Sequence, residues 1–222
     1  MRAIGFAALI LALSTVPATP VRAEEQLGAG LSQSEREYIK THREEYLRGK
    51  LQKRGPVPTD ILAAGSEHAE LEGVAFAYKQ FPDLVTTLAR EVAENAKAFV
   101  TVGSDAEETD ARNRLTAAGA NMANVVFDRV KVNSIWMRDY GPNVVYTRSG
   151  DRVVVDLAYN RPRPLDDAHP SQFAAKRNLP VHVPSLILPG GNLILDGHGV
   201  AIMTNMVFSE EEGCDPNLTT TA

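Results

Sequence analysis

The sequence contains very little cysteine and no strongly basic segment. Cys214 is the single cysteine among 222 residues, so the chain cannot form an internal disulfide bond. Asp and Glu outnumber Lys and Arg, 28 to 23, and a chain of this charge is a poor binder of nucleic acid. We therefore expect no nucleic-acid partner.

Long hydrophobic runs are also scarce. Beyond the N-terminus, no stretch approaches the roughly 18 apolar residues that a membrane-spanning helix needs. Residues 4–13 form one short apolar run, with Arg2 before it and the small residues of Val21-Arg22-Ala23 after it. This pattern predicts a secretory signal peptide over residues 1–23, with an uncleaved anchor or an ordinary apolar N-terminus as the alternatives. Its removal would leave a soluble chain that makes no membrane contact and is secreted or periplasmic.

The remaining residues divide into a polar N-terminal region and a globular part. Residues 24–57 form a polar tail and one helix, which Ser32 or Ser34 caps and which ends near Gly55. The apolar face of this helix is narrow and its charge is high, so we expect it on the surface with its charged side chains in solvent. Residues 58–222 are long enough to bury a core of their own.

From residue 71 onward, strand patterns alternate with helix patterns. The expected elements are strands at 71–78, 97–102 and 124–127 and helices at 82–96 and 104–119. The buried stripe of the first helix is expected to consist of Leu84, Val85, Leu88 and Val92. A hairpin turn is predicted at 148–151, and residues 200–207 are predicted to form a late strand. This order indicates an α/β fold with helices on one or both faces of the sheets.

One stretch combines an indole, a guanidinium, a carboxylate and a phenol: Trp136-Met137-Arg138-Asp139-Tyr140-Gly141-Pro142. An aromatic ring can cover the face of a flat cation, and a carboxylate can bind a guanidinium through two parallel N–H···O bonds. The stretch therefore predicts a guanidinium pocket formed by Trp136 and Asp139 at the end of a strand. The alternative is a structural ion pair between Arg138 and Asp139, with Trp136 in the core.

Two arginines at alternate positions form the second feature, in Tyr159-Asn160-Arg161-Pro162-Arg163-Pro164. The prolines make this segment stiff and extended, so that Arg161 and Arg163 point to the same side. Such a pair is suited to binding a carboxylate or phosphate. The alternative is an exposed proline-rich loop with solvated arginines.

The third feature is a glycine-rich segment over residues 189–199. It has neither the Gly-x-Gly-x-x-Gly nor the Gly-Lys-Ser/Thr spacing of a phosphate site. Its double glycine, Gly190-Gly191, allows the backbone to approach another group closely, and Asp196-Gly197 predicts a hairpin turn. We expect His198 to be a turn residue rather than a catalyst.

Together and in this order, the three motifs resemble the family of agmatine deiminases and bacterial peptidylarginine deiminases, over roughly residues 66–212. The Arg-Pro-Arg-Pro element is similar to the secreted peptidylarginine deiminase branch. The resemblance implies a pentein fold, an α/β propeller of five βαβ-type units around a central site. Residues 58–222 would then be the N-terminal part of the catalytic domain, a partial pentein that is incomplete at its C-terminus.

The resemblance also implies a mechanism and roles for four residues. In the family, a Cys thiolate attacks the guanidinium carbon, a His acts as general acid and base, and ammonia leaves. Water then releases the ureido product from the thiouronium intermediate, and neither a metal nor an organic cofactor is needed. Asp139 matches a catalytic carboxylate that binds the guanidinium, and Trp136 matches the stacking indole. Arg161 and Arg163 match the pair that binds the α-carboxylate of a C-terminal arginine.

The catalytic His, the second Asp and the nucleophilic Cys of the family lie beyond the Gly-Gly-Asn region. Nothing after Ser209 matches their surroundings. Three glutamates precede Cys214 and Asp215 follows it, and these acids oppose thiolate formation. We therefore do not expect Cys214 to be the nucleophile, and we expect this chain alone to be inactive.

The sequence thus predicts an enzyme that hydrolyses peptidyl-arginine to citrulline and ammonia, with arginine-containing peptides or proteins as partners. Agmatine has no carboxylate for Arg161 and Arg163 to bind, which favours a substrate with a C-terminal arginine. An agmatine deiminase and a secreted, non-catalytic guanidinium-binding module are the alternatives.

Overall fold

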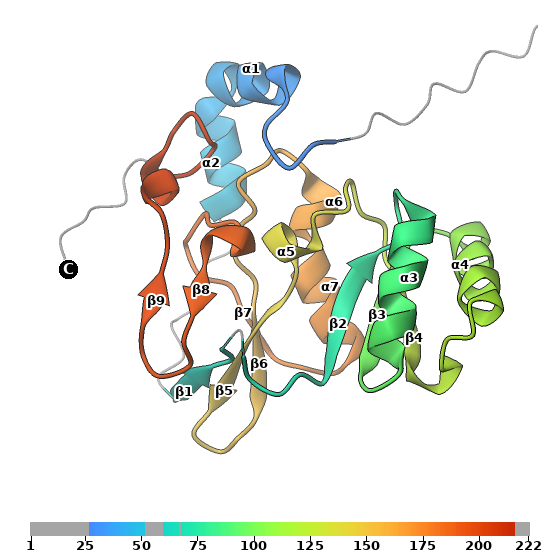
Figure 1. Cartoon of the computed structure of the whole chain (residues 1–222). Helices are drawn as coiled ribbons and strands as arrows, with labels where there is room; N and C mark the ends of the chain where they lie inside the picture. Colours follow the sequence, from blue (N-terminus) through green and yellow to red (C-terminus); the bar gives the residue numbers. More distant parts are fainter. Residues whose placement is uncertain (1–26, 52–59, 67, 216–222) are drawn as a thin grey trace, which may run out of the picture.

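The computed structural model describes residues 27–51, 60–66 and 68–215. The predicted signal peptide, residues 1–23, lies outside these residues. The described chain is a mixed α/β structure with three separate sheets (Figure 1). None of its helices is long and apolar enough to cross a bilayer.

The first sheet is parallel and has the strand order β2-β3-β4. Its strands are β2 (Gly73–Ala77), β3 (Lys97–Val102) and β4 (Val125–Arg129), joined by the helices α3 (Pro82–Ala93) and α4 (Asp105–Ala117). The predicted β–α–β–α–β order is therefore confirmed. The Ser104 side chain caps α4 as expected, and Gly119 follows its end with a φ of 76°.

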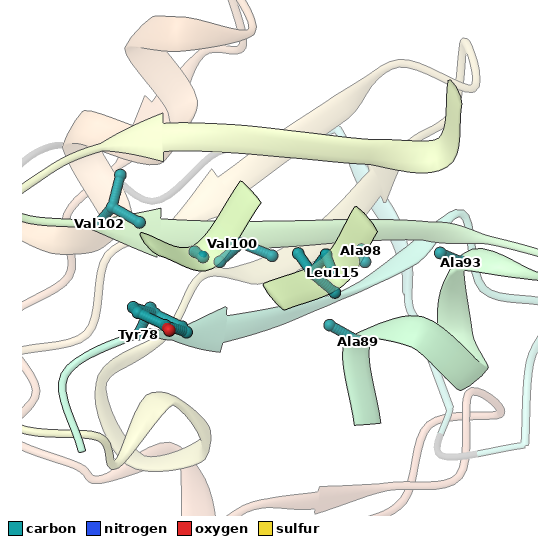
Figure 2. Packing of buried hydrophobic residues seen from close by; sticks show 8 residues of the cluster. Tyr78, Ala89, Ala93, Ala98, Val100, Val102 and Leu115 are labelled. Carbon is teal, nitrogen blue, oxygen red and sulfur yellow. The ribbon is translucent and has the colours of Figure 1, made fainter. Parts of the chain in front are cut away.

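The main core lies between β3 and the two helices (Figure 2). Ala98 and Val100 of β3 are fully buried, and they pack with Ala89 of α3 and Leu115 of α4. Burial of this apolar surface contributes roughly 25 cal/mol per Å² and holds both helices on the sheet.

The prediction for the buried face of α3 is partly wrong. Leu84 is 57% exposed and Leu88 is 46% exposed, whereas Val85 and Val92 do contact the core. The buried face of α3 consists instead of Thr86, Ala89 and Ala93. Small side chains on this face let the helix approach β3 closely, which turns the two leucines outward.

The second sheet has the order β1-β5-β6-β7. It is built from β1 (Ile61–Ala64), β5 (Asn143–Thr147), β6 (Arg152–Val155) and β7 (Val181–His182). The hairpin of β5 and β6 is confirmed, and Gly150 supplies the positive φ, 87°, in its turn.

The third sheet is a two-stranded hairpin of β8 (Ile194–Leu195) and β9 (Ala201–Ile202). The Asp196 carboxylate accepts hydrogen bonds from the backbone N–H groups of His198 and Val200, so the predicted turn is confirmed and His198 is one of its residues. The predicted strand over 200–207 is mostly wrong, because it gives way to the 3-10 helix η3 (Asn205–Phe208).

Short helices fill the connections. They are η1 (Met122–Asn124), α5 (Met137–Tyr140), α6 (Pro164–Asp167), α7 (His169–Lys176) and η2 (Gly190–Asn192).

The N-terminal region forms two helices rather than one, α1 (Gln33–Thr41) and α2 (Arg43–Leu51), which meet at His42. Figure 1 shows them beside the C-terminal part of the described chain. Ser32 is the N-cap, and Glu35 completes a capping box by accepting from the Ser32 backbone N–H.

The expectation that the helix charges are solvated is only partly confirmed. Glu37, Glu44 and Arg48 are exposed, but other charged side chains of the helices pair with the rest of the protein. Arg36 lies 3.2 Å from Glu212, and Lys50 lies 3.2 Å from Asp167. The Tyr46 hydroxyl donates to the Gly213 carbonyl at 2.9 Å, in a buried contact. The two helices therefore pack on the rest of the protein through a narrow apolar stripe that polar contacts surround.

Candidate functional site

The Trp136 stretch does not directly end a strand. β4 stops at Arg129, and residues 137–140 wind into α5. Trp136 and Tyr140 pack in one cluster with Ala77 and Tyr159, and the Tyr140 hydroxyl donates to the Ser134 carbonyl at 2.7 Å. This bond across six residues closes the loop, so the position of the stretch is fixed by side-chain packing rather than by sheet pairing.

Asp166 ties this loop to the Arg-Pro-Arg-Pro segment. Its carboxylate accepts from the backbone N–H groups of Asn133 at 2.6 Å and Ser134 at 3.1 Å, and from the Ser134 hydroxyl at 2.7 Å. Burial raises the pKa of Asp166, although the bonds from Ser134 oppose that rise. Because Asp166 lies in α6, directly after Arg163, these bonds hold two of the sequence motifs together.

The double glycine of the third motif packs directly against the first motif, the Trp136 stretch. A methyl group on Gly190 would lie 2.6 Å from the Arg138 carbonyl, and one on Gly191 would collide with the Asp139 carboxylate. The Gly191 backbone N–H donates to that carboxylate. The predicted close approach of backbone to another group is therefore confirmed, and the group is Asp139.

Asp139 is half-buried in an environment that contains several cations. Burial raises the pKa of the carboxyl, and this effect outweighs the lowering by Arg161, the Gly191 N–H, Arg138 and Arg163. The alternative of a simple Arg138–Asp139 pair is too narrow a description, because both predicted arginines also act on this carboxylate.

Arg161 and Arg163 are not solvated, since they are only 6% and 1% exposed. Arg161 Nε donates to the Ala29 carbonyl at 3.0 Å, and its Nη1 donates to the Glu212 carbonyl at 3.1 Å. Arg163 Nη2 donates to the Gly30 carbonyl at 3.2 Å. The proline-rich loop is thus a buried element, and its arginines contact the N-terminal segment.

Glu35 is the carboxylate partner of Arg163. Arg163 Nε lies 2.7 Å from Glu35 Oε1, and Nη2 lies 3.1 Å from Oε2, so the pair is bidentate. Burial by itself raises the pKa of Glu35, but the bonds and charge of Arg163, together with those from Ser32, lower it overall. Sequence reasoning missed this role, although Ser32-x-x-Glu35 is a readable capping-box pattern.

Trp136 also contacts the N-terminal segment. Its indole Nε1 donates to the Leu27 carbonyl at 2.9 Å. The four predicted residues therefore lie in one region of the protein, around the buried ring of Tyr159. The Tyr159 ring packs near Trp136. The charges of Arg163, Asp139 and Arg161 act on the Tyr159 hydroxyl.

Three polar atoms of the segment from Tyr159 to Arg163 have no hydrogen-bond partner among the described residues. They are the Tyr159 hydroxyl, Asn160 Oδ1 and Arg163 Nη1, and all three residues are at most 1% exposed. An unpaired buried donor costs about 1–3 kcal/mol, and functional sites are a common place for it. Sequence reasoning did not identify Tyr159 as a site residue. Its only signal in the sequence is its position two residues before Arg161.

Cys214 is fully buried. Burial raises the pKa of its thiol to about 11, against the lowering by a hydrogen bond with Asn160 and the charge of Arg161. The sequence also predicted that neighbouring acids would raise the pKa of this thiol. In the structure, burial is the larger cause of the raised pKa, and the charge of Glu212 adds only a part. Within the described ranges, no group of three or more His, Cys, Asp or Glu side chains could hold a metal ion.

A hollow of about 630 Å³ lies behind Arg163, between the N-terminal helices and the residues that follow Arg161. Glu35, Tyr46, Lys50 and Asp167 are among its lining residues. Neither Trp136 nor Asp139 lines it, so the hollow is distinct from the Asp139 side of the site.

The model of the Porphyromonas-type peptidyl-arginine deiminase family matches residues 67–221. The chain belongs to this family. The match includes every predicted site residue, Trp136, Asp139, Arg161 and Arg163, but it begins after α1 and α2. The N-terminal helices that contact the site thus lie outside the region that the family model describes.

Solved structures of pentein deiminases share the fold. The agmatine deiminase of Enterococcus faecalis is 20% identical with a TM-score of 0.64, over 75% of this chain and 51% of that one. A substrate-bound agmatine deiminase of C. jejuni is 18% identical with a TM-score of 0.60, over 76% and 53%. A Porphyromonas gingivalis protein, provisionally named an arginine deiminase, is 16% identical with a TM-score of 0.59, over 72% and 51%. The chain therefore has the α/β pentein architecture and spans about half the length of these structures.

Proposed function

We propose that Trp136, Asp139, Arg161 and Arg163 form the substrate-binding half of a peptidyl-arginine deiminase site. Asp139 binds the guanidinium of the substrate arginine, and Trp136 covers its flat face. Arg161 and Arg163 bind the carboxylate at the end of the peptide.

The observation that supports this proposal most strongly is the grouping of one carboxylate with two buried guanidinium groups. The charges of Arg161 and Arg163 act on Asp139, although α5 and the Arg-Pro-Arg-Pro segment are distant in sequence. An arginine with a free carboxylate carries one flat cation and one anion. The site offers the complementary charges in the same region, on elements that side-chain packing and the Asp166 hydrogen bonds hold together.

The proposed reaction replaces one guanidinium nitrogen by oxygen. A thiolate adds to the guanidinium carbon, ammonia leaves, and water then displaces the thiolate to give the ureido group. The Asp139 carboxylate holds the guanidinium nitrogens during both steps. The buried thiol of Cys214, with its raised pKa, is poorly suited to be that nucleophile. We therefore propose that this chain binds arginine peptides but does not turn them over by itself.

Substrates with a carboxylate are favoured over agmatine because of the two arginines. A ligand without a carboxylate would offer Arg161 and Arg163 no anion of its own to bind. The proposed signal peptide over residues 1–23 agrees with a substrate outside the cytoplasm. Secretion or periplasmic export is part of this proposal.

Calorimetric titration tests the assignment. The ligands are an acetylated peptide ending in arginine, the same peptide with an amidated end, and agmatine. We expect the free carboxylate to bind about tenfold or more tightly than the amide, since a charge-assisted hydrogen bond contributes about 1.5–3 kcal/mol. Arg161→Ala should remove this preference, whereas Arg148→Ala, on the exposed β5–β6 turn, should not.

Each other outcome has a defined meaning. Equal affinity for the free and amidated peptides contradicts the carboxylate assignment. Tighter binding of agmatine than of either peptide favours an agmatine site. Ammonia release by the purified chain contradicts the proposal that it lacks a nucleophile.

A further inference from the structure

The residues proposed to bind arginine are already in contact with the N-terminal segment of the same chain, residues 27–35. Backbone carbonyl groups of this segment accept hydrogen bonds from the side chains of three site residues. Trp136 Nε1 donates to the Leu27 carbonyl, Arg161 Nε to Ala29 and Arg163 Nη2 to Gly30, at 2.9, 3.0 and 3.2 Å. An extended peptide ligand would use the same kind of contact.

The segment also supplies a carboxylate. Glu35 occupies the Nε and Nη2 edge of Arg163, and the two side chains are 11% and 1% exposed. A bidentate pair in such a position uses the donors that a substrate carboxylate would need. The remaining Arg163 nitrogen, Nη1, has no partner among the described residues. A substrate carboxylate must therefore displace Glu35 to form the same two bonds.

The helices fix this segment in place. Tyr46 of α2 donates to Gly213, and Arg36 of α1 donates to the Glu211 carbonyl at 3.0 Å. In Figure 1 the chain that enters α1 dips toward the start of α6, where Arg163 is the N-cap. The anchored helices keep the segment beside the site at a high effective concentration.

We infer that residues 27–35 are a self-ligand that competes with arginine peptides for Trp136, Arg161 and Arg163. This inference rests on the proposed function. The backbone contacts are neutral hydrogen bonds that a peptide can replace one for one. Glu35 makes the charged contact of the segment. It therefore controls the equilibrium between the state in which the segment covers the site and the state in which the site is open to a peptide.

Glu35→Gln is the variant that isolates this control. Glutamine at the third helical position still completes the capping box, so α1 keeps its cap while the negative charge on Arg163 is removed. Glu37→Gln is the matched control, because Glu37 is an exposed residue of the same helix and carries the same charge. Circular dichroism verifies that both variants keep the fold of the parent chain.

The first measurement is affinity for the peptide ending in free arginine. The apparent dissociation constant of a ligand rises when only a fraction of the protein is open to it. We expect Glu35→Gln to bind the peptide about tenfold or more tightly than the parent chain and Glu37→Gln. Trp136 is the single tryptophan, so its emission reports release of Leu27 directly. Glu35→Gln should shift that emission to longer wavelength without ligand, and saturating peptide should change the parent emission as well.

Equal peptide affinity in the parent, Glu35→Gln and Glu37→Gln overturns the inference and leaves the proposed function standing. An increase of the same size in Glu37→Gln also overturns it, because the effect would then be one of net charge. If no variant binds the peptide, even when Trp136 emission shows the segment released, the proposed function fails and the inference fails with it.

Discussion

The carboxylate of Asp139 accepts a hydrogen bond from the backbone N–H of Gly191, and the glycine approaches so closely that a side chain at position 191 would collide with it. A glycine at this position therefore sets the orientation of the proposed guanidinium-binding group. The double glycine has a role in the site although it contributes no functional side chain.

Gly191→Ala is expected to displace the Asp139 carboxylate and to weaken binding of arginine peptides by about tenfold or more. Gly65→Ala is the control, since a methyl group there meets nothing within 4 Å. Calorimetric titration of both variants measures the effect. Unchanged affinity in Gly191→Ala would show that the orientation of Asp139 does not govern binding.

The sequence carries the information for the strands of the parallel sheet and for this close approach, but not for the late strand or for the contacts of the N-terminal helices. Apolar runs identify β2, β3 and β4, and Ser104 and Gly119 mark the ends of α4. Local patterns work there because each signal depends on near neighbours in the chain.

The failures arise where distant residues decide the outcome. Leu84 and Leu88 are apolar at helical spacing, yet Ala89 and Ala93 allow the closer approach to β3 and take the buried face. Glu35 pairs with Arg163 across 128 positions of the chain, and no local pattern indicates which of the many surface carboxylates makes that pair. The same reason hides the contact of Trp136 with Leu27.

Asp139→Asn is expected to lose guanidinium binding and to gain stability. The fold holds the pKa of Asp139 above its unfolded value, so the group opposes folding once the pH exceeds the unfolded pKa, and the full penalty is present above the folded pKa. An uncharged amide removes that penalty. Urea unfolding at neutral pH should therefore show a higher midpoint for the variant, and the difference should vanish in acid below the unfolded pKa.

Asp83→Asn is the control for the expected changes in binding and stability. The Asp83 side chain is 93% exposed and pairs only at the surface with Arg114. Its stability should stay within about 0.5 kcal/mol of the parent. A lower unfolding midpoint for Asp139→Asn than for the parent chain would mean that the carboxylate stabilises the fold instead.

Cys214 is expected to react slowly with iodoacetamide in the folded chain. A thiol with a pKa of about 11 is ionised to only about one part in a thousand at pH 8, and full burial limits access further. Mass spectrometry of the alkylated protein should show rapid modification in denaturant and little without it. Rapid modification of the folded chain would indicate an accessible, activated thiol. It would contradict the proposal that Cys214 is not the nucleophile.

Acidification is expected to release the N-terminal segment from the site. The fold holds the pKa of Glu35 below its unfolded value, so its pair with Arg163 contributes stability above the unfolded pKa and loses it as the pH falls through the folded pKa. Trp136 emission should therefore shift to longer wavelength below the ordinary pKa of a glutamate, before the far-ultraviolet circular dichroism changes. Glu35→Gln should show no such transition because its segment is released at every pH, whereas Glu37→Gln should follow the parent curve. An identical acid transition in Glu35→Gln would assign the change to other carboxylates and would separate the pH response from the Arg163 contact.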